Sequence, residues 1–181
     1  YSNGVSIYQK LVDAANKTKD TLKTKELADT LFIVYDLWAE AYGDCYEIQM
    51  KYANDRVKYY PNDFEISYAK YKAAFTLYPV DEIRSSWVQK YFTTAYMMVR
   101  NEKIECDELL ELYDFLTGIC DKKSVTDKNF ATAQKTLDKY VAPCASCDKL
   151  EELFIPKFEA SPDDVKLMEK IVGMMGGRKC T

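Results

Sequence analysis

The chain has 181 residues, of which 48% are hydrophobic and 30% are charged, so a packed core is expected and disorder is not. Its formal net charge is −4 and it has no Lys/Arg cluster, which argues against a nucleic-acid partner. It contains no histidine, which excludes Ser-His-Asp triads, Cys-His dyads and His-containing metal sites. No apolar run approaches the ~20 residues of a membrane span.

Apolar residues recur with helical spacing along the whole chain, and no stretch shows the sustained alternation of a strand. The pattern predicts nine helices, marked by residues 5–12, 27–38, 46–59, 64–78, 83–98, 109–120, 129–140, 150–158 and 165–175. The connections are short, except at 121–128 and 142–146. Short connections favour antiparallel neighbours, so we expect an all-α fold of stacked helical hairpins.

A proline followed two residues later by an aspartate occurs three times in the chain. The three segments are Tyr60-Pro61-Asn62-Asp63, Tyr78-Pro79-Val80-Asp81 and Ser161-Pro162-Asp163-Asp164. Proline disfavours helical geometry in the residue before it, and an Asp side chain accepts hydrogen bonds from the first turn of a new helix. We therefore expect a helix to end at each proline and the aspartate to cap the next one. The prolines are 18 and 83 residues apart, so the repeat is irregular.

The residues before Pro79 resemble the second helix of a tetratricopeptide repeat (TPR), a helix–turn–helix unit of ~34 residues. Ser67, Tyr71 and Ala74 match its small, aromatic and alanine positions. Before Pro162 only the aromatic position is kept, by Phe154, and the first-helix pattern of a TPR is not cleanly present. This register predicts an irregular TPR-like α-solenoid that forms a single domain over residues 1–181.

Three segments resemble an N-terminal helical region found in secreted TPR proteins of Bacteroidetes-type bacteria. They are residues 147–165 together with Cys180, residues 31–36 and residues 1–5. The resemblance covers most of the chain. It implies an export signal before Tyr1, further repeats after Thr181, and a periplasmic or outer-membrane-associated scaffold without catalytic residues.

Six cysteines occur, at positions 45, 106, 120, 144, 147 and 180. Cys106 and Cys120 lie at opposite ends of one predicted helix, about 21 Å apart at ~1.5 Å per residue, so they cannot pair with each other. Cys147 begins the eighth helix and Cys180 follows the ninth, and these ends meet in an antiparallel hairpin. We therefore predict a Cys147–Cys180 disulfide, with Cys144–Cys180 as the second choice, in an oxidising compartment. Cys45, Cys106 and Cys120 are expected to be free and buried.

The segment from Pro143 to Cys147 supports an alternative chemistry. It places a C-x-x-C pair, Cys144 and Cys147, at a helix start, where the helix dipole lowers a thiol pKa. This favours a thiol-redox or disulfide-handling protein, although the βαβ pattern of thioredoxin-like proteins is absent. A zinc site formed by Cys144, Cys147 and Cys180 would lack a second C-x-x-C pair.

Two further groups of residues have an ordinary and a functional interpretation. The acidic residues within 107–111 and 151–152 fall on polar helix faces near lysines, which favours a solvated surface over acid–base catalysis. The aromatic and Met side chains within 91–98 could line a peptide groove, but at helical spacing they more often form core. Trp38 and Trp87 have the same two interpretations.

Together these patterns predict a non-catalytic TPR-like scaffold that binds an unidentified protein or peptide in the cell envelope. They predict no catalytic, cofactor-binding or metal-binding residues, no nucleic-acid partner and no membrane span. The thiol-redox protein that uses Cys144 and Cys147 is the alternative.

Overall fold

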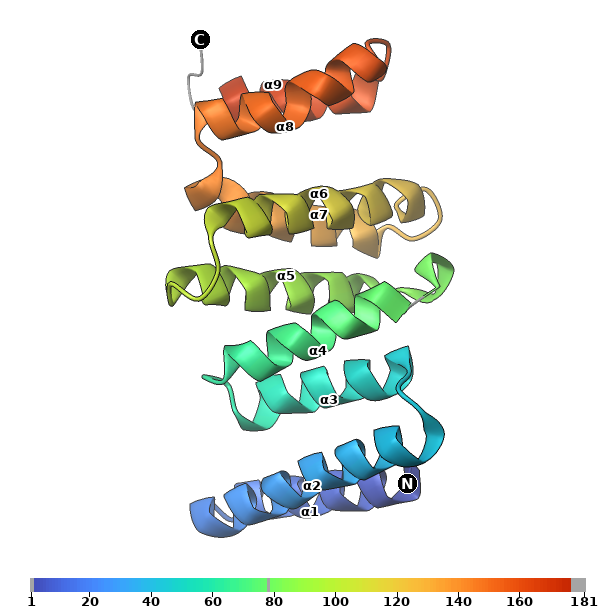
Figure 1. Ribbon diagram of the computed structural model, residues 1–181, viewed down its shortest axis with the longest axis vertical. Coiled ribbons are helices and arrows are strands. Elements are labelled where there is room, and N and C mark those ends of the chain that lie inside the picture. The colour runs from blue at the N-terminus through green and yellow to red at the C-terminus, as the bar shows by residue number, and fades with distance from the viewer. Residues whose placement is uncertain (1, 78, 177–181) are drawn as a thin grey trace. The chain divides into compact units, whose positions relative to one another are not determined.

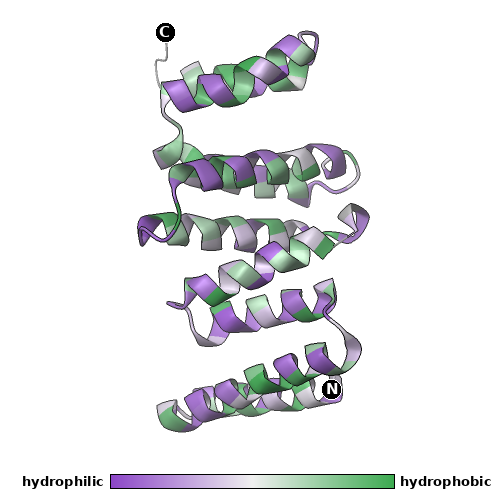
Figure 2. Ribbon diagram, viewed as in Figure 1, coloured by the Kyte–Doolittle hydropathy of each residue, from purple (hydrophilic) through white to green (hydrophobic). Residues whose placement is uncertain are grey.

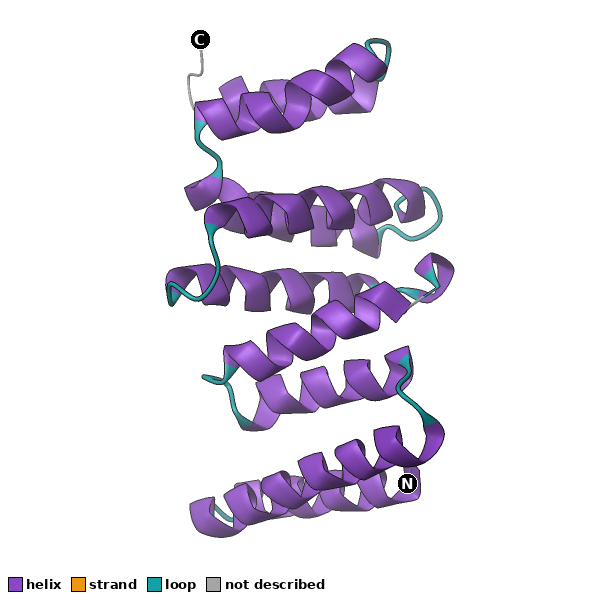
Figure 3. Ribbon diagram, viewed as in Figure 1, coloured by secondary structure: helices purple, strands orange, loops and turns teal. Residues whose placement is uncertain are grey.

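The computed structural model describes residues 2–77 and 79–176, and these ranges consist of helices joined by short connections (Figures 1 and 3). The all-α prediction is confirmed for the described residues, as are the nine predicted helical regions. The α-helices are α1 (Ser2–Lys17), α2 (Thr21–Tyr42), α3 (Tyr46–Tyr59), α4 (Phe64–Leu77), α5 (Ser85–Arg100), α6 (Cys106–Lys123), α7 (Asn129–Val141), α8 (Cys147–Ala160) and α9 (Val165–Gly176). Two short 3₁₀ helices, η1 (Val80–Glu82) and η2 (Ala142–Cys144), lie in connections.

The chain divides into two compact units, which are described separately: unit 1 (Tyr1–Lys103) and unit 2 (Ile104–Thr181). In unit 1 each helix packs against the next, from α1 through α5. In unit 2, α6 packs against α7 and α8 packs against α9, while η2 contacts α6 and α7. These pairings are the helical hairpins expected from the short connections. The single domain over residues 1–181 stays a prediction.

Side-chain caps fix the starts of three helices, α2, α8 and α9. The Asp20 Oδ1 atom accepts a hydrogen bond from the Lys23 N–H at 3.0 Å and begins α2. The Asp164 Oδ1 atom accepts one from the Leu167 N–H at 3.1 Å, which confirms the predicted cap of α9. Ser146 caps α8 in the same way through the Lys149 N–H, at 3.4 Å.

The other two proline signatures end helices as predicted but begin the next ones differently. Asp63 precedes α4, and its carboxylate accepts a hydrogen bond from the Arg56 Nε atom at 3.0 Å. Arg56, in the last turn of α3, therefore binds the Asp63 side chain. Asp81 lies inside η1, and Arg84 is the residue that precedes α5, so the prediction that Asp81 caps the next α-helix is wrong.

The core of unit 1 begins between α1, α2 and α3 and contains a buried carboxylate. Its buried members are Val5, Val12, Ala28, Leu31, Phe32, Tyr35, Ile48 and Tyr52. Asp55 is only 8% exposed, and one of its oxygens accepts hydrogen bonds from Gln9 Nε2 at 2.7 Å and from the Tyr35 hydroxyl at 2.8 Å. Because the donors come from α1 and α2 and the acceptor from α3, this network joins three helices.

The second part of the unit 1 core is an aromatic seam between α4 and α5. The ring of Tyr91 lies 5.7, 5.8 and 5.0 Å from those of Tyr68, Tyr71 and Phe75, within the range of favourable aromatic pairs. Phe92 is fully buried beside it. The aromatic residues of 91–98 that could have lined a groove therefore lie mainly in the core.

Unit 2 has a smaller apolar core, whose fully buried large side chains are Leu109, Tyr113, Leu116, Phe130, Leu137 and Leu150.

Two predicted connections are shorter than expected. α6 continues to Lys123, and η2 occupies the first part of residues 142–146. The η2 turn brings the end of α7 back beside α6.

Candidate functional site

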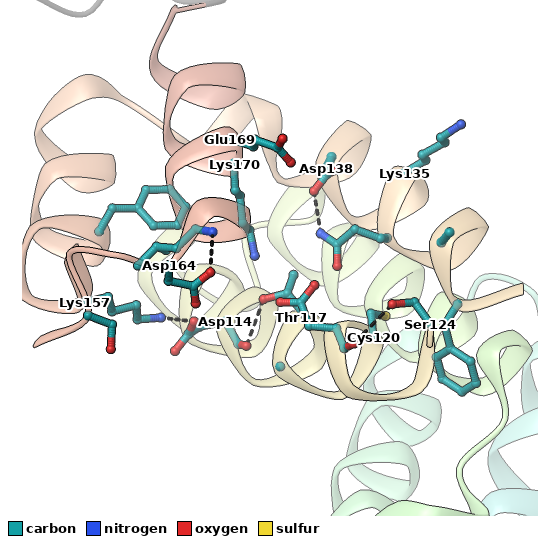
Figure 4. A pocket seen from close by; sticks show the side chains of 18 of the residues that line it. Asp114, Thr117, Cys120, Ser124, Lys135, Asp138, Lys157, Asp164, Glu169 and Lys170 are labelled. Atoms are coloured by element: carbon teal, nitrogen blue, oxygen red, sulfur yellow. Dashed lines mark hydrogen bonds and ion pairs between the residues drawn. The ribbon is translucent and has the colours of Figure 1, made fainter. Parts of the chain in front are cut away.

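A charged cavity of about 820 Å³ lies in unit 2, where side chains of α6, α7, α8 and α9 converge (Figure 4). Asp114, Asp121 and Asp138 come from α6 and α7, whereas Lys157 and Lys170 come from α8 and α9. Its volume is in the range of small-molecule sites. The cavity therefore combines acids from one hairpin with amines from the other.

Two carboxylates of this cavity, Asp114 and Asp138, bind protein donors. Lys157 forms an ion pair with Asp114. The same Asp138 oxygen accepts hydrogen bonds from the Tyr113 hydroxyl at 2.8 Å and from Gln134 Nε2 at 2.7 Å. These bonds orient the carboxylates toward protein donors, an arrangement that holds α6, α7 and α8 together.

Lys170 differs from a surface lysine because its ammonium group is partly buried and lies against an aromatic ring. Its Nζ atom lies 4.8 Å from the centre of the Tyr113 ring, a cation–π distance. Burial lowers the pKa of this ammonium group, while the nearby Asp121 and Asp138 carboxylates oppose the shift. Sequence reasoning missed Lys170, because the acids around it come from two other helices.

The cavity offers polar groups that a ligand could bind. The buried Oε1 atom of Gln134 has no hydrogen-bond partner within the part of the chain that the structure describes, so it offers an acceptor to a polar guest. No group of three or more Cys, Asp or Glu residues with the geometry of a metal site occurs among the described residues.

Cys120 borders the cavity as a free, buried thiol, as the sequence predicts. Burial, reinforced by the Asp121 charge, raises its pKa to about 12. The thiol is therefore protonated at neutral pH and a poor nucleophile.

Three predictions about the other cysteines are wrong. Cys106 is not free, because it forms a disulfide with Cys144, with the two Cα atoms 5.2 Å apart. Cys45 is free but exposed, not buried. The second-choice pairing of Cys144 with Cys180 is wrong, because Cys144 is bonded to Cys106.

Cys147 takes part in both the predicted disulfide and the predicted redox pair. The predicted Cys147–Cys180 disulfide involves Cys180, which lies outside the described residues, so the pairing stays a prediction. The Cys144–Cys147 redox pair is not formed in this structure, since Cys144 is held by Cys106.

An apolar groove of about 310 Å³ runs between α8 and α9. Its lining is formed by Phe154, Ile155, Phe158, Met168, Ile171, Val172 and Met175. Phe154 is buried at its floor, whereas Ile155, Phe158 and Val172 are 48%, 41% and 70% exposed. Figure 2 shows the apolar residues of this hairpin in green. The helical periodicity of α8 and α9 indicated these residues as core, and the structure leaves several of them at the surface.

The other candidate residues have the ordinary role that their pattern favoured. Asp107 and Glu152 are largely exposed and both pair with Lys149, at 2.8 and 3.7 Å. Trp38 and Trp87 are half-buried against their helical neighbours. Among the described residues, no helix combines the length and apolar character that crossing a bilayer requires.

Comparison with known proteins returns no family model, no curated protein and no solved structure that matches this chain. The resemblance to secreted TPR proteins therefore stays a prediction.

Proposed function

We propose that this chain is a non-catalytic, TPR-like helical scaffold of the cell envelope and that it binds a protein or peptide through the apolar groove of α8 and α9. The observation that carries the proposal is the exposure of Ile155, Phe158 and Val172 around a buried floor. Contiguous apolar surface of this kind marks interaction sites in proteins. A groove between two helices suits an amphipathic helix, which places apolar side chains into such a groove at helical spacing.

The TPR-like part of the proposal is supported by α4. Ser67, Tyr71 and Ala74, which match the small, aromatic and alanine positions of a TPR, are each fully buried. These are the positions at which a repeat packs against its neighbours. We propose on this basis that the hairpins form an irregular TPR-like α-solenoid.

The envelope location is supported by the Cys106–Cys144 disulfide. Disulfides of this kind persist in oxidising compartments and are rare in the cytosol. Export to the periplasm or the outer membrane would provide that environment.

The proposal is tested by measuring whether labelled helical peptides bind the groove. We would titrate fluorescent amphipathic peptides of either charge with the wild-type protein, Val172→Asp and the matched control Val125→Asp, and follow anisotropy. Val125 is 78% exposed in the connection between α6 and α7, so it tests the same substitution away from the groove.

We expect binding by the wild type and by the control, and affinity at least about tenfold weaker in Val172→Asp, since an aspartate in an apolar interface loses its hydration. Failure of every peptide to bind, or equal binding by Val172→Asp, would contradict the proposed function.

A further inference from the structure

The rim of the apolar groove is acidic on the α8 side. Glu151 and Glu159 lie one turn before and one turn after Ile155, so all three share a face of the helix. α8 carries four acids, at positions 148, 151, 152 and 159, but only two lysines. The groove wall formed by Ile155 is therefore flanked by carboxylates.

Both lysines of α8 are directed toward α6. Lys149 pairs with Asp107 at 2.8 Å, although it also lies 3.7 Å from Glu152, and Lys157 pairs with Asp114. These contacts neutralise acids of α6, and among the side chains that the structure describes no cation forms an ion pair with Glu151 or Glu159. The half-buried Lys170 of α9 lines the charged cavity and not the groove.

The apolar lining is adaptable as well as exposed. Met168 and Met175 lie two turns apart on α9 with Val172 between them, and all three line the groove. Unbranched thioether side chains adjust to different apolar partners, which is why methionine is frequent at surfaces that bind helices. An acidic rim around such a lining is complementary to a helix that carries cationic residues beside its apolar face.

From this geometry we infer that the groove selects a basic amphipathic helix of a partner protein, with apolar anchors at i, i+3 or i+4, and i+7 and with Lys or Arg on the flank that meets Glu151 and Glu159. The inference rests on the proposed function and specifies its partner. A second copy of this chain would bring two acidic rims together, and an anionic membrane surface would be repelled by them.

The inference is tested with two helical peptides that share one set of apolar residues and differ only in their polar residues, which are Lys in one and Glu in the other. We expect the Lys peptide to bind about tenfold or more tightly at low ionic strength, with an advantage that shrinks as salt is added. The double variant Glu151→Gln with Glu159→Gln should lose most of that advantage. A matched control, Glu26→Gln with Glu40→Gln on α2 of unit 1, should keep it.

The outcomes separate the inference from the proposed function. Equal binding of both peptides, abolished by Val172→Asp, would overturn the basic-helix inference and leave the peptide-binding function standing. Absence of binding by either peptide would overturn both. Two further results would assign the groove to another occupant and overturn the inference: self-association in sedimentation velocity that Val172→Asp removes, or binding to phosphatidylserine-containing vesicles that it removes.

Discussion

Unit 1 and unit 2 are both built from antiparallel helices, but different interactions hold them together. In unit 1 the Tyr68, Tyr71, Phe75 and Tyr91 rings form a continuous seam, and the buried Asp55 network joins three helices. In unit 2 a charged cavity lies between the two hairpins, ion pairs of Lys149 and Lys157 join α8 to α6, and the Cys106–Cys144 disulfide joins α6 to η2. Both units have apolar cores and ion pairs, and the Cys106–Cys144 disulfide adds a covalent link within unit 2.

The two units also differ in how their exposed apolar side chains are arranged. Exposed apolar side chains occur in both units, but in the α8/α9 hairpin of unit 2 Ile155, Phe158 and Val172 gather around one groove that nothing in the described chain covers. The two tryptophans, Trp38 and Trp87, both lie in unit 1. Tryptophan fluorescence therefore reports unit 1 alone, while far-UV circular dichroism reports both units, and the pair of signals can distinguish them.

The largest expected effect is removal of the unit 2 disulfide. Cys106→Ser together with Cys144→Ser should destabilise unit 2 by about 4 kcal/mol, because the bond closes a loop with a sequence separation of 38 residues. In urea, circular dichroism should show an early transition while the tryptophan transition stays unchanged. Cys45→Ser, at an exposed free thiol, is the control. A tryptophan midpoint that moves with the circular dichroism would contradict independent stabilisation of the units.

The two free thiols, Cys45 of unit 1 and Cys120 of unit 2, should differ strongly in their rate of alkylation. Cys45 in unit 1 is exposed, whereas Cys120 in unit 2 is buried with its pKa raised to about 12. Because the thiolate is the reactive form and burial also blocks access to Cys120, iodoacetamide at neutral pH should modify Cys45 much faster. Mass spectrometry of peptides from a time course measures both rates. Similar rates would mean that the charged cavity opens readily to solvent.

Next in size is the loss of one donor to the buried carboxylate of unit 1. Tyr35→Phe should lower the free energy of unfolding by about 1–3 kcal/mol, because Asp55 then keeps a single strong donor, Gln9. Urea titration followed by circular dichroism measures the change. Tyr8→Phe, at a partly buried tyrosine of α1, serves as the control and should have a smaller effect. Equal effects would show that the network contributes little.

The smallest effect is expected for an ion pair of unit 2. Lys157→Met should cost about 0–1 kcal/mol, because the side chains of Lys157 and Asp114 are 35% and 42% exposed. The cost should vanish in high salt, which thermal unfolding at two ionic strengths would show. Lys135→Met, at another lysine lining the cavity, controls for the loss of charge. A loss well above 1 kcal/mol that persists in salt would mean that the pair is shielded from solvent.

The helices and some of their caps could be predicted from the sequence because their causes are local. Apolar spacing within one segment is enough to indicate α3, whose predicted range of 46–59 matches the structure, and a carboxylate three residues before an N–H is enough to cap α9 through Asp164. Asp63 differs, because its carboxylate accepts a hydrogen bond from Arg56 of α3. Whether Arg56 reaches Asp63 depends on the turn between α3 and α4, which no local pattern indicates.

The candidate site and the disulfide could not be predicted because they depend on which helices meet. Cys106 and Cys144 become neighbours only because η2 returns the chain to the start of α6. Lys170 and the acids around it lie on different helices, and no local pattern connects them. The apolar periodicity of α9 predicts burial for Val172, which the structure leaves 70% exposed, because periodicity does not indicate how many apolar faces of a helix find neighbours.

The most direct test of the central claim, that the α8/α9 groove receives a basic amphipathic helix, is a methyl NMR titration. Methyl-labelled methionine gives six signals, of which Met168 and Met175 line the groove while Met50 and Met98 are buried in unit 1. Addition of the Lys-bearing peptide should shift the signals of Met168 and Met175 in a saturable manner and leave those of Met50 and Met98 in place. Saturable shifts confined to unit 1, or no shifts at all, would contradict the account.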